Sequence, residues 1–241
     1  MDRSEFLSEL YRIFTLNGLE NYLNEERADR FFLLYEHLVR ENERFNLTAV
    51  TEGRAVILRH LCDSVCVAPY LPGGTLIDVG CGAGFPSLPL AICRPDIRVT
   101  ALDATKKRTD YVKGCGELLG LTNLTVICAR AEDAAKGELR ESFDAATARG
   151  VAELRVLAEL CLPFVRVGGL FLAMKGKSAD EEAAAARAGI GTLGARPEGR
   201  KEIALTDGEE TLARPALLYR KERKTPEGYP RAYARICKKP L

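Results

Sequence analysis

Glycine alternates with small residues over positions 80–84, directly after a short apolar segment that ends in Asp78-Val79. Glycine adopts positive φ angles without strain and lets the backbone approach a bound molecule closely. A loop of this kind between a strand and a helix is typical of nucleotide-like ligands, although the pattern also fits a tight turn that binds nothing. Phe85 stands where dinucleotide-binding loops carry their third glycine, which counts against a pyrophosphate at this position.

Asp103 ends the next apolar segment, about twenty residues after the glycines, where such ligands place their ribose. A carboxylate there accepts hydrogen bonds from both hydroxyls of an adenosine. An adenosine ligand without phosphates, S-adenosylmethionine, therefore fits the loop better than a dinucleotide. Asp78 could face the amino or sulfonium side of that ligand, or it could accept hydrogen bonds from the N–H groups of the turn itself.

Polar groups also follow the third and fourth apolar segments. After the third, the N–H of Ala131 could meet an adenine ring and Glu132 could accept from its exocyclic amine. A surface ion pair is the alternative role for Glu132. Arg149 ends the fourth segment, at the edge where an open α/β sheet binds its ligand. We therefore expect Arg149 to contact the edge of the ligand or the incoming substrate.

The nature of the methyl acceptor is narrowed by motifs that the chain lacks. Positions 148–150 read Ala-Arg-Gly, without the D/N-P-P-Y motif of many enzymes that methylate exocyclic amines. Methylation of pyrimidine carbon-5 needs a cysteine nucleophile, and Cys161, which precedes Leu-Pro, lies in a predicted helix where we expect it to pack. A ring nitrogen with a free lone pair, such as guanine N7, needs no catalytic base. We therefore assign no catalytic residue.

These groups require a framework that brings the ends of strands together. Short apolar segments alternate with helical stretches, which predicts a parallel sheet covered by helices on both faces. After an alanine-rich helix over 178–188, two further strands are expected to close the sheet. The expected strands are 75–79, 98–103, 124–129, 143–148, 169–174, 203–205 and 216–220, and the helices between the first five are 86–93, 106–119 and 153–165.

The two ends of the chain differ from this pattern. Apolar side chains recur at three-to-four spacing over 5–16, 25–45 and 52–68, which predicts helices there. The last dozen residues are expected to be extended, because prolines at 226, 230 and 240 interrupt any regular helix. We accordingly divide the chain into a helical cap (1–70), a main domain (71–221) and a basic tail (222–241).

Composition excludes several classes of protein. The 241 residues carry 35 Lys and Arg against 34 Asp and Glu, and no apolar run is long enough to cross a bilayer. The N-terminus lacks a secretion signal, and the eight cysteines form no C-x-x-C pair. We therefore expect a cytoplasmic protein with buried, reduced thiols and no metal site. Residues 214–241 carry nine Lys and Arg but only two Glu, which suggests contact with a polyanion.

The order and spacing of several motifs resemble the bacterial small-subunit ribosomal RNA guanine-N7 methyltransferase G family, also called glucose-inhibited division protein B. The resemblance extends over residues 5–241. It rests on Asn46-Leu47-Thr48, His60-Leu61-Cys62-Asp63-Ser64, the block 78–92, Leu102-Asp103-Ala104 with Lys106-Lys107-Arg108, Arg130-Ala131-Glu132, Thr147-Ala148-Arg149, Lys175-Gly176, Tyr229-Pro230-Arg231 and Lys238-Lys239-Pro240-Leu241. Ala104 and Thr147 replace serines that are usual in the family.

The resemblance implies a Rossmann-like class I S-adenosylmethionine-dependent methyltransferase, with a mostly parallel seven-stranded sheet and an N-terminal helical cap. Its donor-binding positions fall here on Gly80, Phe85, Ala131, Glu132 and Arg149, to which the ribose argument adds Asp103.

The resemblance also implies a reaction and its partner. The expected reaction transfers a methyl group from S-adenosylmethionine to N7 of a guanosine in the 530 loop of 16S rRNA, presented as naked rRNA or in the 30S subunit. No membrane, DNA or metal is expected as a partner, and a monomer is expected. Another RNA base, a small-molecule acceptor and a non-enzymatic role in ribosome assembly stay open as alternatives.

Overall fold

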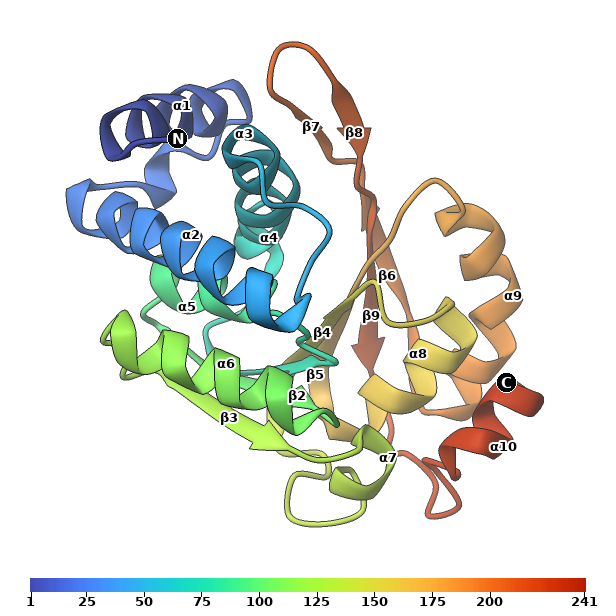
Figure 1. Ribbon diagram of the computed structural model, residues 1–241. Helices are drawn as coiled ribbons and strands as arrows, with labels where there is room; N and C mark the ends of the chain where they lie inside the picture. The colour runs from blue at the N-terminus through green and yellow to red at the C-terminus, as the bar shows by residue number, and fades with distance from the viewer.

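The computed structural model describes residues 1–241 and has a seven-stranded sheet at its centre (Figure 1). The strand order is β3-β2-β1-β4-β5-β9-β6, in which the first five strands run parallel and β9 lies antiparallel between β5 and β6. The expected fold class is confirmed. The strands are β1 (Gly74–Val79), β2 (Ile97–Asp103), β3 (Leu124–Cys128), β4 (Phe143–Arg149), β5 (Val165–Met174), β6 (Ala195–Lys201) and β9 (Ala216–Lys221).

The strand order reverses between β1 and β4, which pair with each other at the middle of the sheet. From β1 the chain builds outward to β2 and β3, and it then returns to add β4 and β5 on the other side. In open α/β sheets, ligands bind outside the carboxyl ends of the strands at such a reversal. The loops that follow β1, β2, β3 and β4 are therefore the ones expected to form a site.

Both faces of the sheet are buried. Side chains of a strand alternate between the two faces, and in β1 Leu76 belongs to one hydrophobic cluster while Ile77 belongs to the other. In β5, Leu172 and Phe171 divide in the same way. This burial explains why the central strands read as almost continuous apolar runs in the sequence.

Helices cover each face. The cap, α5 (Ser87–Cys93) and α6 (Lys106–Leu118) cover one side, and α8 (Leu154–Cys161) with α9 (Ala179–Thr192) covers the other (Figure 1). The short helix α7 (Ala131–Ala134) follows β3 directly.

The cap consists of α1 (Arg3–Leu16), α2 (Glu25–Phe45) and a third helical stretch. Side chains of Asp2 and Asn24 accept hydrogen bonds from backbone N–H groups in the first turns of α1 and α2, which fixes where these helices begin. The third stretch consists of α3 (Gly53–Val56), a π-helical segment (Ile57–Cys62) and α4 (Asp63–Val65). Short 3-10 turns lie at Glu20–Tyr22 and Ala68–Tyr70, and one outside the cap lies at Leu162–Phe164.

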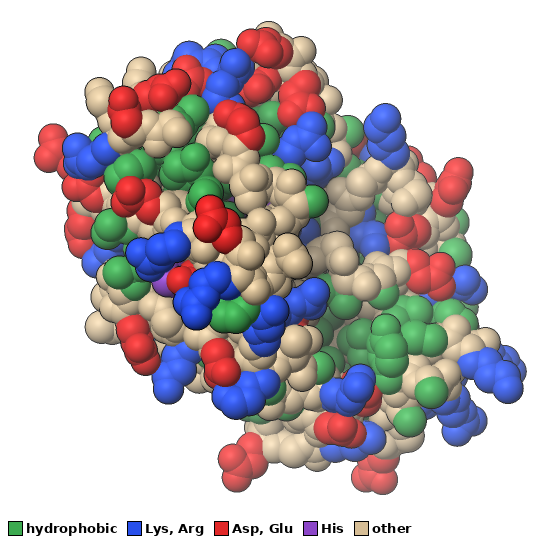
Figure 2. Space-filling view, viewed as in Figure 1, with side chains coloured by type: hydrophobic (Ala, Val, Ile, Leu, Met, Phe, Trp, Pro, Cys, Tyr) green, Lys and Arg blue, Asp and Glu red, His purple; other side chains and the backbone are tan.

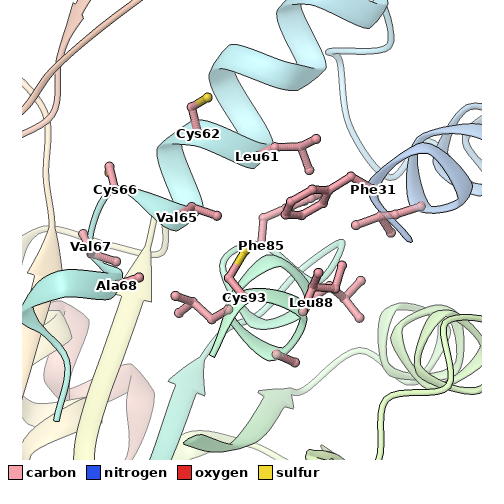
Figure 3. Packing of buried hydrophobic residues seen from close by; sticks show 14 of the residues in the cluster. Phe31, Leu61, Cys62, Val65, Cys66, Val67, Ala68, Phe85, Leu88 and Cys93 are labelled. Carbon is pink, nitrogen blue, oxygen red and sulfur yellow. The ribbon is translucent and has the colours of Figure 1, made fainter. Parts of the chain in front are cut away.

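The cap shares its hydrophobic core with the sheet. Phe31 of α2 and Leu61 and Val65 of the third cap stretch lie in one apolar cluster with Leu88 and Cys93 of α5 (Figure 3). The same cluster continues to side chains of β1, β2 and β5. The hydrophobic core is therefore continuous across residue 70. The division of the chain at residues 70 and 221 stays a prediction.

One expected strand lies elsewhere. Segment 203–205 does not join the sheet, so that prediction is wrong: β7 (Ala204–Thr206) forms a separate hairpin with β8 (Thr211–Ala213). The Asn17 side-chain amide donates to the Thr206 carbonyl at 2.7 Å and its oxygen accepts from the Thr206 N–H at 2.8 Å. These long-range bonds fix the hairpin to the cap.

The seventh strand is instead β6, at the edge of the sheet beyond β9. Its residues after Ala195 are exposed and mostly charged, and the pairing register shifts between Pro197 and Gly199. Proline and a bulge are features of edge strands, which need no apolar pattern because they are only partly covered. Because β6 is polar and contains proline and glycine, its sequence does not predict a strand.

The tail contains a short helix, α10 (Tyr233–Lys238), so the expectation of a wholly extended tail is wrong. Proline excludes a helix at its own position and disfavours one at the preceding residue, and α10 lies between Pro230 and Pro240 without including either. Ile236 is fully buried and belongs to the same cluster as α8 and α9, which supplies the packing that a six-residue helix needs.

Two expectations from composition can also be compared with the structure. All eight cysteines are free, and six are buried, whereas Cys128 and Cys237 are exposed, so the expectation of buried thiols fails at these two positions. None of the helices combines the length and apolar character needed to span a bilayer.

Candidate functional site

A cavity of ≈ 330 Å³ opens at the carboxyl ends of β1 to β4, at the reversal in strand order. Its volume lies near the lower end of the range for small-ligand sites, roughly 300–1,000 Å³. Four of the six predicted donor-binding residues line it: Gly80, Asp103, Ala131 and Glu132. We call it the first cavity. Its other walls come from Val79, Leu102, Ala104, Thr105, Arg108, Ala129, Arg130, Gly150, Val151, Leu160 and Tyr233.

The glycine loop is held close to the end of β2. The N–H groups of Gly80 and Cys81 both donate to the Leu102 carbonyl, at 2.7 and 3.0 Å. Gly80 has a φ of 76°, and a Cβ at this position would lie 2.7 Å from a Val151 methyl group. A side chain at position 80 would therefore displace Val151, which also lines the cavity, so glycine is required for the close packing of this loop.

Asp103 joins the loop that follows β1 to the loop that follows β2, and both loops line the cavity. Its Oδ2 accepts from the Gly82 N–H at 3.1 Å and its Oδ1 accepts from the Thr105 N–H at 2.8 Å. The residue is only 6% exposed, and Arg108 lies 3.7 Å from the carboxylate. Each carboxylate oxygen can accept a second hydrogen bond, so Asp103 can still bind two hydroxyl groups while its loops stay fixed.

Asp78 fulfils the structural role that the sequence left open, but with one oxygen only. Its Oδ2 accepts from the N–H and hydroxyl of Ser87, at the start of α5, while Oδ1 is buried without a hydrogen-bond partner. Burial raises the pKa of Asp78 to about 6, although the Ser87 hydrogen bonds oppose this. Asp78 lines neither the first cavity nor the second cavity beside it, so its side chain does not face a ligand site.

Ala131 and Glu132 begin the short helix α7 and also line the first cavity. Glu132 is 7% exposed and forms no ion pair, so the alternative of a surface ion pair is wrong. A buried carboxylate without a protein partner is costly unless a ligand donates to it. The cavity thus combines the glycine loop with the Asp103 and Glu132 carboxylates, a set of groups that fits an adenosyl group.

Phe85 and Arg149 lie beside the first cavity and do not line it. Phe85 is buried and stacks on the His60 imidazole, with ring centroids 4.5 Å apart and planes 14° apart. The Arg149 guanidinium lies 5.7 Å from the Phe85 ring centroid, within range of a cation–π contact. The sequence grouped these two residues with the other four. In the structure Arg149 lines a second cavity, whereas Phe85 lines neither cavity and packs against His60 and Arg149.

A second cavity, of ≈ 390 Å³, adjoins the first and shares Gly150 with it. Four cationic side chains and only two carboxylates line it, and Figure 2 shows Lys and Arg side chains beside the hollow between the cap and the α8 side of the molecule. It is lined by Val50, Arg59, His60, Asp63, Arg149, Gly150, Met174, Lys175, Gly176, Glu182 and Arg214. The positive excess favours an anionic ligand.

Asp63 organises the second cavity. The carboxylate accepts from Arg149 Nη1 at 2.8 Å and forms an ion pair with Arg214 Nε at 2.9 Å. Arg149 Nη1 also donates to the Arg59 carbonyl at 3.0 Å, so Arg149 is fixed against the third helical stretch of the cap. No individual role was predicted from the sequence for Asp63, Arg59 or Arg214. Only Asp63 carried a signal, as part of the motif at 60–64.

His60 is held between the cap and the glycine loop. Its Nε2 hydrogen-bonds the Thr48 hydroxyl at 3.0 Å, while its ring stacks on Phe85. Burial, assisted by the positive charge of Arg149, lowers the pKa of His60 to about 4. The imidazole is therefore neutral near pH 7, and it adds no charge to the junction of the two cavities.

This pKa predicts an acid-dependent loss of stability. Below about pH 6.5 the unfolded chain protonates His60 while the folded chain does not, so stability is complete above that pH and falls as the pH drops toward 4. Between pH 7 and pH 5, His60 should lower the free energy of unfolding by about 2 kcal/mol. Urea unfolding at both pH values should show a smaller loss in His60→Phe, which keeps the ring stack. Equal losses in the two proteins would contradict the assignment.

The fold and the first cavity define a class of protein. Similar solved structures include precorrin-6y C5,15-methyltransferase from Geobacter metallireducens, with a TM-score of 0.51, 14% identity and coverage of 78% of this chain and 98% of that one. Geranyl diphosphate C-methyltransferase from Streptomyces coelicolor, in complex with S-adenosyl-L-homocysteine, has a TM-score of 0.51 and 14% identity, covering 66% and 78%. The chain has the class I S-adenosylmethionine-dependent methyltransferase fold.

Within this class, sequence similarity shows the family. The family model GidB, described as rRNA small subunit methyltransferase G, matches residues 27–206. A relative from Leuconostoc citreum, named ribosomal RNA small subunit methyltransferase G, is 40% identical over 235 residues, which cover 95% of this chain and 97% of the relative. The chain belongs to the rRNA small subunit methyltransferase G family, as the motifs indicated.

Proposed function

We propose that the protein transfers a methyl group from S-adenosylmethionine to N7 of a guanosine in the 530 loop of 16S rRNA, in the cytoplasm. Membership of the family supports the reaction class and an RNA acceptor. The observation that carries the proposal is the contact between the two cavities at Gly150. A cavity whose two carboxylates are balanced by two arginines suits the adenosyl donor, and a cavity with an excess of cations beside it suits a nucleotide with its phosphates.

The donor is proposed to lie along the first cavity, with its ribose at Asp103 and its adenine at Ala131 and Glu132. Gly80 provides the backbone surface against which the donor packs. Phe85 and Arg149 lie at the junction of the cavities, where the sulfonium methyl group would meet the acceptor. Five of the six predicted donor-binding residues line one of the two cavities, and Phe85 contacts Arg149 from outside them, which supports this placement of the donor.

The side chains near this path suit an acceptor that needs no activation. Guanine N7 carries a free lone pair, so positioning of the two reactants is the main contribution that the protein must make. Cys161 is fully buried in α8, and burial raises its pKa well above the ordinary value, which makes it a poor nucleophile. This supports a ring nitrogen over pyrimidine carbon-5.

The proposal is tested by mapping the methylated nucleotide. Purified protein would be incubated with labelled S-adenosylmethionine and with 30S subunits, or naked 16S rRNA, from a strain without this modification. We expect label at one guanosine of the 530 loop, located by mass spectrometry of RNA fragments. Label at another base, label only in small molecules, or no transfer to either RNA would overturn the proposal, and the last result would favour a non-enzymatic role in assembly.

RNA binding through the second cavity predicts a specific dependence on salt. Arg59 lines this cavity, while its partner Glu210 lies 2.6 Å away outside it. If Arg59 neutralises one phosphate, Arg59→Gln should weaken RNA binding and reduce the slope of log affinity against log salt by about 1. Arg196, which pairs with Glu222 at the far edge strand β6, provides the control Arg196→Gln. Identical slopes for the two variants would contradict an Arg59–phosphate contact.

A further inference from the structure

The C-terminal segment returns to the first cavity. Tyr233, the first residue of α10, lines this cavity together with Glu132 and Arg130. Figure 1 shows α10 near α8, on the face of the sheet that α8 and α9 cover. A residue near the end of the sequence thus forms a wall of a site whose other walls come from the loops after β1 to β4.

This position is fixed by buried ionic contacts. The Arg231 side chain pairs with Glu159 of α8, whose exposed fraction is 0%, and the Arg231 backbone N–H donates to the same carboxylate at 2.8 Å. Arg140 donates to the carbonyl groups of Tyr229 and Thr225, at 2.8 and 2.7 Å. These bonds hold the approach to α10 from two sides, so Tyr233 is presented at the cavity by a rigid support.

We infer that Tyr233 forms the adenine-facing wall of the donor site, so that the C-terminal segment 226–241 is part of that site. The inference rests on the proposed donor and adds a contact that the glycine loop and strand ends do not supply. Glu132 stands beside Tyr233 and can accept from an exocyclic amine, while the tyrosine ring provides an apolar face for the purine. One wall therefore offers both interactions that an adenine needs.

An RNA contact is the competing role for an aromatic side chain in a basic tail. Tyr233 does not line the second cavity, where cations are in excess, whereas it does line the first cavity, where two carboxylates balance two arginines. The nearby Cys237 thiol raises the pKa of Tyr233, so its hydroxyl is neutral near pH 7. These observations favour the donor over an RNA base.

The test measures ligand affinity by calorimetry, independently of turnover. S-adenosylhomocysteine and 5′-methylthioadenosine would each be titrated into the wild-type protein, Tyr233→Ala and Tyr233→Phe. Because a stacked base contributes about 1–3 kcal/mol, Tyr233→Ala should weaken both ligands about tenfold or more, whereas Tyr233→Phe should change them less than about twofold. Tyr11 of α1 is 40% exposed, as Tyr233 is, so Tyr11→Ala is a matched control that should leave both affinities unchanged.

A second variant tests the support of Tyr233. Arg231→Gln should weaken both ligands in the wild-type background but add little to Tyr233→Ala, because Arg231 acts through the position of Tyr233. Thermal unfolding without ligand shows that each variant is folded.

The outcomes separate the inference from the proposed function. Unchanged affinity of Tyr233→Ala for both ligands overturns the inference, and a loss confined to RNA affinity reassigns Tyr233 to the RNA. Failure of the wild-type protein to bind either ligand overturns the proposed donor as well.

Discussion

Replacing Asp103 with alanine is expected to lower the affinity for S-adenosylhomocysteine about a hundredfold, which corresponds to roughly 2.7 kcal/mol. The side chain provides the two acceptor oxygens at the ribose side of the first cavity. Hydrogen bonds to a charged group contribute about 1.5–3 kcal/mol each, and their loss is compounded because the Gly82 and Thr105 N–H groups lose their acceptors too. Calorimetry measures the affinity directly, without a contribution from the RNA substrate.

Two further variants show whether the Asp103 effect comes from the ribose. Asp103→Asn keeps one acceptor oxygen and the shape of the side chain, so a smaller loss, about tenfold, is expected. Asp110 lies on α6, the helix that follows Asp103 in the chain, and it pairs with Lys106 at the surface, so Asp110→Asn should have no effect. An Asp103→Ala variant that is folded and binds S-adenosylhomocysteine with unchanged affinity would show that the ribose lies elsewhere.

The central part of the fold could be predicted from the sequence because its physical causes are local. Most residues of strands β1, β2 and β4 are buried, so these segments are mainly apolar, and the helices between them carry their own periodicity. The glycines after β1 and the carboxylate that ends β2 mark the carboxyl edge of the sheet. Four of the six predicted donor-binding residues therefore lie in one cavity, as their positions at strand ends indicated.

The misplaced elements depend on contacts between residues distant in the sequence. The β7–β8 hairpin is held to the cap by Asn17, which is 189 residues from Thr206 along the chain. The tail helix α10 follows an arginine that pairs with Glu159, which is 72 residues away. No local sequence pattern predicts the contact of Asn17 with Thr206 or that of Arg231 with Glu159. Propensity and proline positions consequently gave the wrong structure at both places.

The second cavity was missed for a similar reason. Its organising carboxylate, Asp63, comes from the cap, while Arg149 ends β4 and Arg214 lies between the hairpin and β9. The sequence indicated that Arg149 would reach the ligand edge of the sheet, but it could not show that a cap residue orients the guanidinium. The cap is thus part of the site as well as part of the hydrophobic core.

Replacing Arg149 with alanine is expected to reduce the rate of methyl transfer by on the order of a hundredfold, with a smaller effect on S-adenosylhomocysteine affinity. Within the protein, only Nη1 of Arg149 is hydrogen-bonded, to Asp63 and to the Arg59 carbonyl. Nε and Nη2 therefore remain available to a ligand at the junction of the cavities. Single-turnover kinetics with 30S subunits would measure the rate, and calorimetry the affinity.

Folding should survive the Arg149→Ala change because Asp63 keeps its ion pair with Arg214 at 2.9 Å, so no carboxylate is left buried without a partner. Thermal unfolding would check this. Arg149→Lys keeps the charge but has a single nitrogen to divide between Asp63 and the ligand, so an intermediate rate is expected. The control is Arg166→Ala, which removes a comparable ion pair with Asp144 at the opposite end of the sheet. If Arg149→Ala were as active as this control, the guanidinium would be a structural tie between cap and sheet, and the acceptor would be positioned by the other cations of the second cavity.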